Sequence, residues 1–416
     1  MATRKKCKTR HVCVVLRGVL DWRTRKTINA LIEMGKEVSL VHFSAEEIDK
    51  DAIPGCHILK AMPVGVGASE SPIRLIRIAV NLGPKRIANH FYQKRQGAFF
   101  EAHMTRIIMS VKPDIIHAVN VDTLEASAVA AQKLGAYLVY EAFEYWPEHI
   151  LEDCLYYDTV QRSTAIQAEA SYTAHADLFF TVSDTLAKAY QEHYGLTHIP
   201  LVIYNAPIES ASAATPAHQP LRFLFLGNLQ EERNVISMLD AAIATPEVQF
   251  TFQGSGLMQD EIARRIDESG TQDRIFIKAP VPFEQIALSA NSFDVGVLAH
   301  KSYNMQMEGA LPNKFFEYLA GGLAVIVPDT DVFRNFPDID DFALLVNDPD
   351  EKSLAIAFDE CIQRTDINQM KKAALNKARE YTGDVQKERI QNFYSTLDLK
   401  TPLSQGSSES ARVSVQ

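Results

Sequence analysis

The chain has 416 residues, of which 46% are hydrophobic and 23% are charged. This composition is ordinary for a globular protein, and the length exceeds one typical core, so we expect two domains. The formal net charge of −10 argues against a general nucleic-acid binder, because such proteins carry excess positive charge. Five scattered cysteines without metal-ligand spacing indicate free thiols in a reducing compartment, so we expect a cytoplasmic protein.

The first half of the chain alternates apolar strands with helices that have one apolar face. It opens with a strand, a polar loop that holds Arg17 and Gly18, a helix that ends near Gly35, and a second strand. This order is typical of an α/β protein with a doubly wound sheet. Strands are predicted at 12–16, 38–43, 114–119, 137–142, 177–182 and 201–204, and later helices at 124–134 and 156–174.

Residues 71–112 are strongly basic in an acidic chain. They contain eight Lys and Arg residues against one acid, Glu101, with aromatic and aliphatic residues between them. One interpretation is an amphipathic surface for an anionic membrane or acceptor. The alternative is a pair of core-facing helices with a solvated basic side.

The strand at 137–142 runs into a polar and aromatic loop, EAFEYWPEHI. Ligand sites of open α/β sheets form at the carboxyl ends of the strands. Acid/base or acceptor contacts are therefore expected from Glu141, Glu144, Glu148 and His149. A loop whose carboxylates face water is an equally good explanation for any single one of them.

The second half repeats the pattern after a stretch rich in Ala, Ser and Pro, APIESASAATPAHQP, which is typical of a linker. Strands are predicted at 221–226, 248–252, 274–278, 294–298, 323–327 and 342–346, and helices from 235 and at 351–363, 367–381 and 385–397. We therefore expect an N-terminal domain at 1–207, a linker at 208–220, a second domain at 221–382, a helix at 383–398 and a disordered tail at 399–416.

The most informative stretch is LPNKFFEYLAGGLAVIV, residues 311–327. Pro312 fits the first position of a helix whose buried face would hold Phe316, Leu319, Ala320 and Leu323. The helix N-terminus and Lys314 would favour an anion, and Glu317, one turn later, could accept hydrogen bonds from a sugar diol. Anion and diol together suggest a nucleotide. The alternative is an ordinary helix with a solvated Lys/Glu pair.

Two other segments bear on ligand binding. FQGSG contains Gly254 and Gly256 but lacks the third glycine of a dinucleotide fingerprint, so an NAD enzyme is disfavoured. Arg233 follows the strand-glycine unit LFLGN, which ends in Gly227 and Asn228. Together with Lys314 it would supply two cations for a departing diphosphate; a surface pairing of Arg233 with Glu231 or Glu232 is the alternative.

Asp-x-Asp pairs occur at 329–331, 338–340 and 348–350, in a segment rich in turns and without a basic partner motif. Although such pairs can hold a divalent metal beside a diphosphate, solvated loops explain them better here. We therefore predict no metal site.

Several segments in this order resemble the family-4 type of GT-B glycosyltransferases, which are retaining and depend on a nucleotide sugar. They are PDIIHAVNVDTLEAS, YLVYEAFEYWPE, ADLFFTVSDTLA, IYNAPI, LFLGNLQEER, FQGSG and LPNKFFEYLAGGLAVIV. The resemblance covers residues 11–396. It implies two Rossmann-like domains that face each other across a cleft, with the donor bound mainly by the second domain and the acceptor by the first.

The resemblance also implies roles for individual residues. Glu317 matches the second glutamate of a Glu-x7-Glu motif, which holds the donor ribose, whereas the first falls on Gly309, with Glu308 beside it. Pro312 and Asn313 are further donor candidates, with Gly227, Gly254 and Gly256. The family's phosphate-binding pair falls on Asn228 and Arg233, so Lys314 is the replacement for the missing cation. The family's first-domain histidine falls on Phe143, with Glu144 keeping the acidic place beside it. The acceptor side is assigned to Arg17, Gly18, Phe143 and His149.

The sequence therefore predicts a retaining, metal-independent transfer of sugar from a nucleoside diphosphate donor, with Arg233, Lys314 and Glu144 at the reaction. No cofactor beyond the donor is expected. The expected acceptor is a hydroxyl of a polysaccharide, a lipid-linked glycan or a cell-envelope glycan, and the protein could lie on the inner face of the membrane. A non-catalytic nucleotide-sugar-binding subunit and a nucleotide-sugar epimerase are the alternatives.

Overall fold

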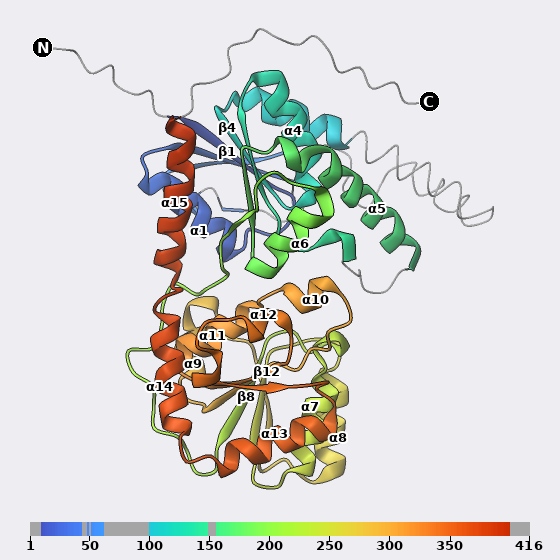
Figure 1. The fold of residues 1–416 in the computed structure, drawn as a ribbon, viewed down its shortest axis with the longest axis vertical. Helices are drawn as coiled ribbons and strands as arrows, with labels where there is room; N and C mark the ends of the chain where they lie inside the picture. The colour runs from blue at the N-terminus through green and yellow to red at the C-terminus, as the bar shows by residue number, and fades with distance from the viewer. Residues whose placement is uncertain (1–9, 44–47, 50, 62–99, 149–154, 400–416) are drawn as a thin grey trace, which may run out of the picture. The chain divides into compact units, whose positions relative to one another are not determined.

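A computed structural model describes residues 10–43, 48–49, 51–61, 100–148 and 155–399 (Figure 1). The chain divides into two compact units. Unit 1 comprises Met1–Ala142, Cys154–Phe179 and Ile390–Gln416, and unit 2 comprises Phe143–Asp153 and Phe180–Arg389.

The first sheet lies largely in unit 1 and has seven strands in the order β3-β2-β1-β4-β5-β6-β7. Adjacent strands pair in parallel, as in β1 with β2 and β1 with β4. The order reverses direction at β1, which is the doubly wound arrangement expected from the sequence. The strands are β1 (His11–Leu16), β2 (Glu37–His42), β3 (Cys56–Lys60), β4 (Ile115–Val119), β5 (Tyr137–Glu141), β6 (Leu178–Thr181) and β7 (Leu201–Val202).

Strand β3 is absent from the sequence prediction. It lies at the sheet edge and buries only Cys56 fully, so its sequence, CHILK, lacks the continuous apolar run of a central strand. The other six strands agree with the prediction to within two residues, because each has an almost fully buried apolar run.

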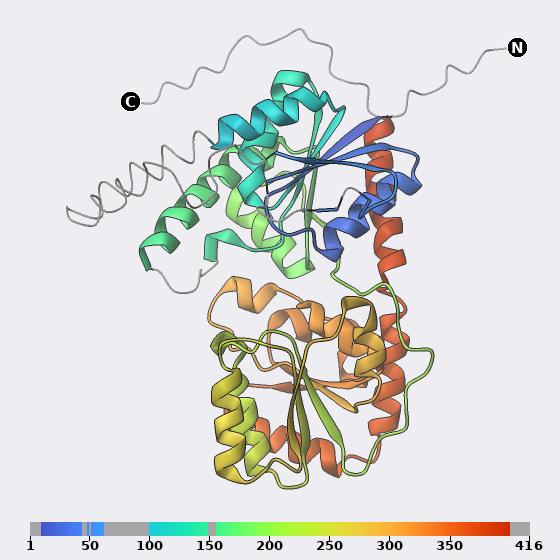
Figure 2. The same ribbon diagram turned by 180° about the vertical axis from the view of Figure 1, so that it is seen from behind.

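Helices flank the sheet of unit 1 on both sides, as Figure 2 shows. They include α1 (Trp22–Glu33), α4 (Val121–Leu134), α5 (Leu155–Tyr172) and the part of α15 (Gly383–Leu399) that follows Arg389. Helix α1 begins where the Asp21 carboxylate accepts a hydrogen bond from the Thr24 amide at 2.9 Å. Helix α15 is tied to the sheet at His117, whose ring contacts the Tyr394 hydroxyl at 2.5 Å and the Glu141 carboxylate at 2.9 Å.

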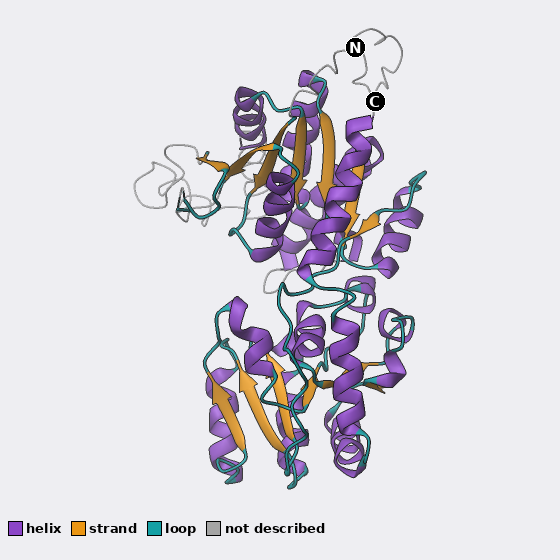
Figure 3. Ribbon diagram, turned by 90° about the vertical axis from the view of Figure 1, so that its left-hand side faces the viewer, coloured by secondary structure: helices purple, strands orange, loops and turns teal. Residues whose placement is uncertain are grey.

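Unit 2 is built on a six-stranded parallel sheet in the order β10-β9-β8-β11-β12-β13. Figure 3 shows strands of this sheet in orange with helices in purple around them. Its strands are β8 (Arg222–Leu226), β9 (Gln249–Gln253), β10 (Ile275–Lys278), β11 (Val295–Val297), β12 (Ala324–Pro328) and β13 (Ala343–Val346). Its helices are α6 (Asp184–Tyr194), α7 (Val235–Ala244), α8 (Gln259–Ser269), α9 (Ile286–Ala290), α10 (Met305–Gly309), α11 (Asn313–Gly321), α12 (Asp331–Arg334), α13 (Glu351–Gln363) and α14 (Ile367–Ala378).

Two apolar clusters cover the two faces of this second sheet. One packs Phe223, Phe225 and Phe250 against α7, α8 and α13. The other packs Leu224, Leu226 and Val325 against α11 and α14. Alternate residues of one strand thus enter opposite clusters, and the central strands are buried on both faces.

Some expectations fall on residues that the structure does not describe. These are His149, the part of the basic stretch that runs from 71 to 99, and the tail from residue 400. Within the described residues, no helix combines the length and the apolar character needed to cross a bilayer.

Candidate active site

The site is built around α11, which starts directly after Pro312. The sequence placed Pro312 in the first helical position, and this is wrong by one residue. Its φ of −70° and ψ of 150° are extended, and helix α11 begins at Asn313. A proline ring fixes φ but not ψ, so the residue suits the cap as well as the first turn. The helix ends at Gly322, whose φ of +70° permits a left-handed cap.

Helix α11 is buried on nearly all sides rather than on one face. The predicted apolar face is buried, but Phe315, Glu317 and Tyr318 are buried as well. The Tyr318 hydroxyl accepts a hydrogen bond from the Leu226 amide at 2.9 Å, which ties α11 to the end of β8. Because Glu317 is only 6% exposed, the alternative of a fully solvated Lys/Glu pair is wrong.

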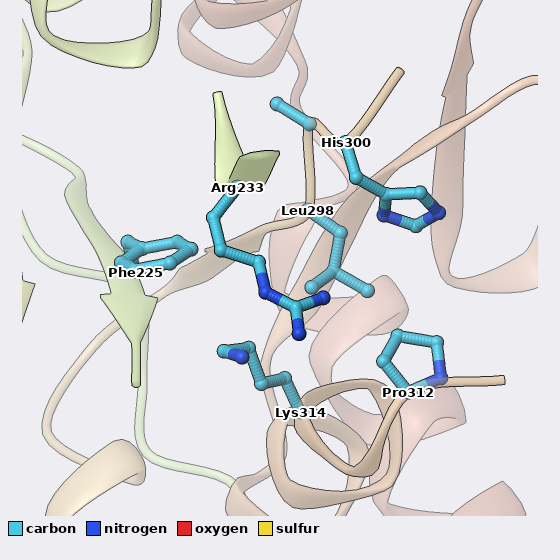
Figure 4. A pocket seen from close by; sticks show the side chains of 7 residues that line it. Phe225, Arg233, Leu298, His300, Pro312 and Lys314 are labelled. Atoms are coloured by element: carbon cyan, nitrogen blue, oxygen red, sulfur yellow. The ribbon is translucent and has the colours of Figure 1, made fainter. Parts of the chain in front are cut away.

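Arg233 and Lys314 meet at one recess in unit 2, as Figure 4 shows. Arg233 lies in a short turn (Glu231–Arg233) after β8, and Lys314 lies in the first turn of α11. The sequence therefore correctly brought these two cations together. The recess is lined by Phe225, Arg233, Leu298, Ala299, His300, Pro312 and Lys314.

Lys314 reaches across the end of β8. Its ammonium nitrogen lies 5.6 Å from the centre of the Phe225 ring. At Gly227, which has a φ of +114°, an added Cβ would lie 2.4 Å from the Lys314 Cε. Position 227 therefore requires glycine for two reasons: its positive φ, and the Lys314 side chain that lies where a Cβ would be.

A nearby acid, Glu317, compensates the charge of Lys314 only in part. Burial and the nearby Arg233 lower the pKa of Lys314 to about 8, although Glu317 acts in the opposite direction. Burial raises the pKa of Glu317 to about 7 in spite of Lys314. A bound anion would relieve both the repulsion between the cations and their loss of water.

Gly254 and Gly256 pack against the loop that follows β8. An added Cβ would lie 1.8 Å from the Gly227 carbonyl oxygen at Gly254 and 2.6 Å from the Asn228 Oδ1 at Gly256. The Leu229 amide donates to the Ser255 carbonyl at 2.9 Å. Both glycines thus let two loops touch and hold the residues around Gly227 in place; neither they nor the exposed Asn228 line the recess.

Gly309 stands where the Glu-x7-Glu motif would have its first glutamate, and its surroundings leave no room for a side chain. At Gly309 an added Cβ would lie 2.7 Å from Leu186 Cδ2. The carboxylate of Glu308 accepts hydrogen bonds from the Asp331 amide at 2.8 Å and from the Ser302 hydroxyl. Glu308 is therefore held by α12 and does not line the recess.

The residues assigned to the acceptor have different surroundings. Arg17 and Gly18 are exposed after β1, and the Arg17 guanidinium lies 4.8 Å from the centre of the Phe100 ring. Phe143 is 7% exposed. Glu144 is half-buried, and its backbone carbonyl accepts a hydrogen bond from the Tyr190 hydroxyl at 2.5 Å.

The first Asp-x-Asp pair has a basic partner that the sequence prediction overlooked. Arg334 contacts Asp329 at 2.6 Å and Asp331 at 2.8 Å. Over the described ranges, no three His, Cys, Asp or Glu side chains gather in a way that could hold a metal ion.

The sequence prediction missed His300, together with Leu298 and Ala299. These residues follow β11, a short buried strand of only three residues, Val295–Val297. The signal was present, because loops after parallel strands form ligand sites. The sequence prediction did not include this loop because no motif marks it.

Residues 23–206 match the family model of Glycosyltransferase Family 4. No curated protein sequence matches the chain. The match covers most of the first sheet, from the start of α1 to just beyond β7.

Solved structures resemble nearly the whole chain. Sucrose-phosphate synthase from Thermosynechococcus elongatus is 15% identical with a TM-score of 0.67, covering 93% of this chain and 99% of its own. HepE of Anabaena, solved with UDP, is 14% identical with a TM-score of 0.66, covering 93% and 100%. A glycosyltransferase from Rickettsia africae is 13% identical with a TM-score of 0.65, covering 94% and 99%.

These structural likenesses establish the fold, and the family model identifies the first part of the chain. The resemblance inferred from the sequence motifs is confirmed. The chain therefore has the GT-B fold of glycosyltransferases, and its residues 23–206 match the Glycosyltransferase Family 4 model.

Proposed function

We propose that the protein transfers a sugar from a nucleoside diphosphate sugar to a hydroxyl of a glycan or a lipid-linked acceptor, with retention and without a metal. The observation that carries this proposal is the pair Arg233 and Lys314 at one recess, beside the start of α11. Structures of HepE with UDP and with UDP-glucose support a donor of this class.

The two cations suit a group whose negative charge grows during the reaction. As the bond to the sugar breaks, the diphosphate gains charge on its leaving oxygen. Arg233 and Lys314 are held in place before that happens, so they stabilise the transition state without a reorganisation cost. In a retaining transfer the departing diphosphate can take the proton of the acceptor hydroxyl on the same face of the sugar.

Glu317 is the proposed partner of the donor ribose. It is the buried carboxylate one turn after Lys314, and two hydroxyl groups could donate to its two oxygens. Glu144 remains the third residue proposed at the reaction, beside Arg233 and Lys314. The proposed acceptor-side residues remain the exposed Arg17 and Gly18, with Phe143 and His149.

The roles of Glu317 and Arg233 can be separated by kinetics. In Glu317→Ala we expect weaker donor binding, because the ribose contact exists before and during the reaction. In Arg233→Ala we expect mainly a lower kcat, because the contact strengthens as the diphosphate departs. Arg264→Ala is the matched control, since Arg264 is an exposed residue of α8 paired with Glu261 and Glu268. Full activity in either site variant would refute the assignment.

A non-catalytic nucleotide-sugar-binding subunit is the second candidate. It is favoured by Gly309, which leaves no side chain where a motif glutamate is expected, and by the engagement of Glu308 with α12. A UDP or GDP sugar that binds but is not turned over with any acceptor pool would support it. A donor at a hundred times its dissociation constant should raise the unfolding free energy by about 2.7 kcal/mol in either case.

A further inference from the structure

No carboxylate of the described residues lines the recess around Arg233. Gly309 has no side chain, and Glu308 is bonded to Ser302 and to the Asp331 amide. Arg233 and Lys314 offer only hydrogen-bond donors. A sugar presents hydroxyl groups that need acceptors as well, and a polar side chain of the recess can supply one.

Among the described side chains that line the recess, His300 is the one that can accept a hydrogen bond. It follows β11 and is 7% exposed. Its loop is fixed from both sides, because the Leu298 amide donates to the Ile326 carbonyl at 2.8 Å and the Asn234 side-chain amide donates to the Ala299 carbonyl at 2.9 Å. The His300 ring also lies 6.4 Å from the Phe333 ring, at 49° to it. Figure 4 shows His300 and Arg233 at the same recess.

The surroundings keep this imidazole neutral near pH 7. Burial and Arg233 lower the pKa of His300 to about 4, while a hydrogen bond with the Met307 backbone acts in the opposite direction. A backbone group that favours the protonated ring is a carbonyl that accepts from a ring N–H. In a neutral imidazole the other ring nitrogen is then an acceptor.

We propose that His300 is a specificity residue that accepts a hydrogen bond from a hydroxyl of the transferred sugar. This inference rests on the proposed function, since it requires a nucleoside diphosphate sugar at the recess. His300 is not assigned to the diphosphate, because an acceptor nitrogen repels phosphate oxygens, which already have Arg233 and Lys314 as donors.

The test compares nucleotides with and without the sugar. Titration calorimetry with UDP and UDP-glucose, and with GDP and GDP-mannose, is carried out on the wild type, His300→Ala and His300→Gln. We expect His300→Ala to bind the nucleoside diphosphate within about twofold of the wild type and the nucleotide sugar about tenfold more weakly. His300→Gln should recover part of the loss, because its side-chain carbonyl can also accept.

The outcomes separate this proposal from the function on which it rests. If the wild type binds none of the four probes, the proposed function fails, and the role of His300 fails with it. If the wild type binds them but His300→Ala weakens the nucleoside diphosphate as much as the nucleotide sugar, or changes neither, only the role of His300 is refuted. Should His300→Ala fail to fold, His300→Gln and His300→Phe give the same comparison, with Phe unable to accept a hydrogen bond.

Discussion

Replacing Gly227 with alanine should disable the recess without removing either of its cations. The new Cβ would lie 2.4 Å from Cε and 2.8 Å from Nζ of Lys314. Real Cβ atoms do not approach other atoms so closely, so the lysine side chain has to move. The backbone φ of +114° adds strain for any residue other than glycine, of about 1–3 kcal/mol.

The expected loss of affinity follows from the contact that Lys314 would make. A hydrogen bond to a charged group contributes about 1.5–3 kcal/mol, which corresponds to a roughly 10- to 150-fold weaker binding of a nucleoside diphosphate. The Gly227→Ala variant should therefore approach the affinity of Lys314→Ala. The double variant should be little worse than either, because both changes remove the same contact.

Gly270→Ala is the matched control for backbone strain. Gly270 caps α8 with a φ of +68°, and an added Cβ would have no heavy atom within 4 Å. Thermal unfolding should show both variants to be destabilised, whereas titration with UDP and GDP should show a loss of affinity only in Gly227→Ala. Unchanged affinity in Gly227→Ala would refute the argument that Lys314 must lie across Gly227 to bind the anion.

The charges of unit 2 give two further predictions. Because the pKa of Lys314 is lowered to about 8 and the anion needs its ammonium form, affinity for UDP should begin to fall as the pH reaches about 8. Above that pH it should fall by up to about tenfold per unit, while Lys314→Met should show a flat profile; a flat wild-type profile would contradict the assignment. Lys371→Met should lower the unfolding free energy by about 3–5 kcal/mol, since Lys371 and Asp294 form a 2.7 Å ion pair with both side chains fully buried. Chemical denaturation checks this against Lys372→Met, an exposed neighbour, and equal stabilities would count against it.

The sequence by itself determined the α/β class and most strands of both sheets. The reason is local, because a central parallel strand is buried on both faces and must be apolar along its length, as in β1 and β12. The edge strand β3 was not predicted, since three of its five residues are exposed and it has no continuous apolar run. The sequence also paired Arg233 with Lys314. Each lies in a connection that follows a strand, and a parallel sheet places the carboxyl ends of its strands at the same edge.

Only the tertiary structure decided the surroundings of these residues. The burial of Glu317 depends on helices and strands far from it in the sequence, which enclose α11 on nearly all sides. The need for glycine at Gly227 depends on the path of Lys314, and the lack of space at Gly309 depends on Leu186. His300 joins the recess because β11 lies between β8 and β12 in the sheet. Such contacts join residues distant in the chain, so no local pattern of residue types could have specified them.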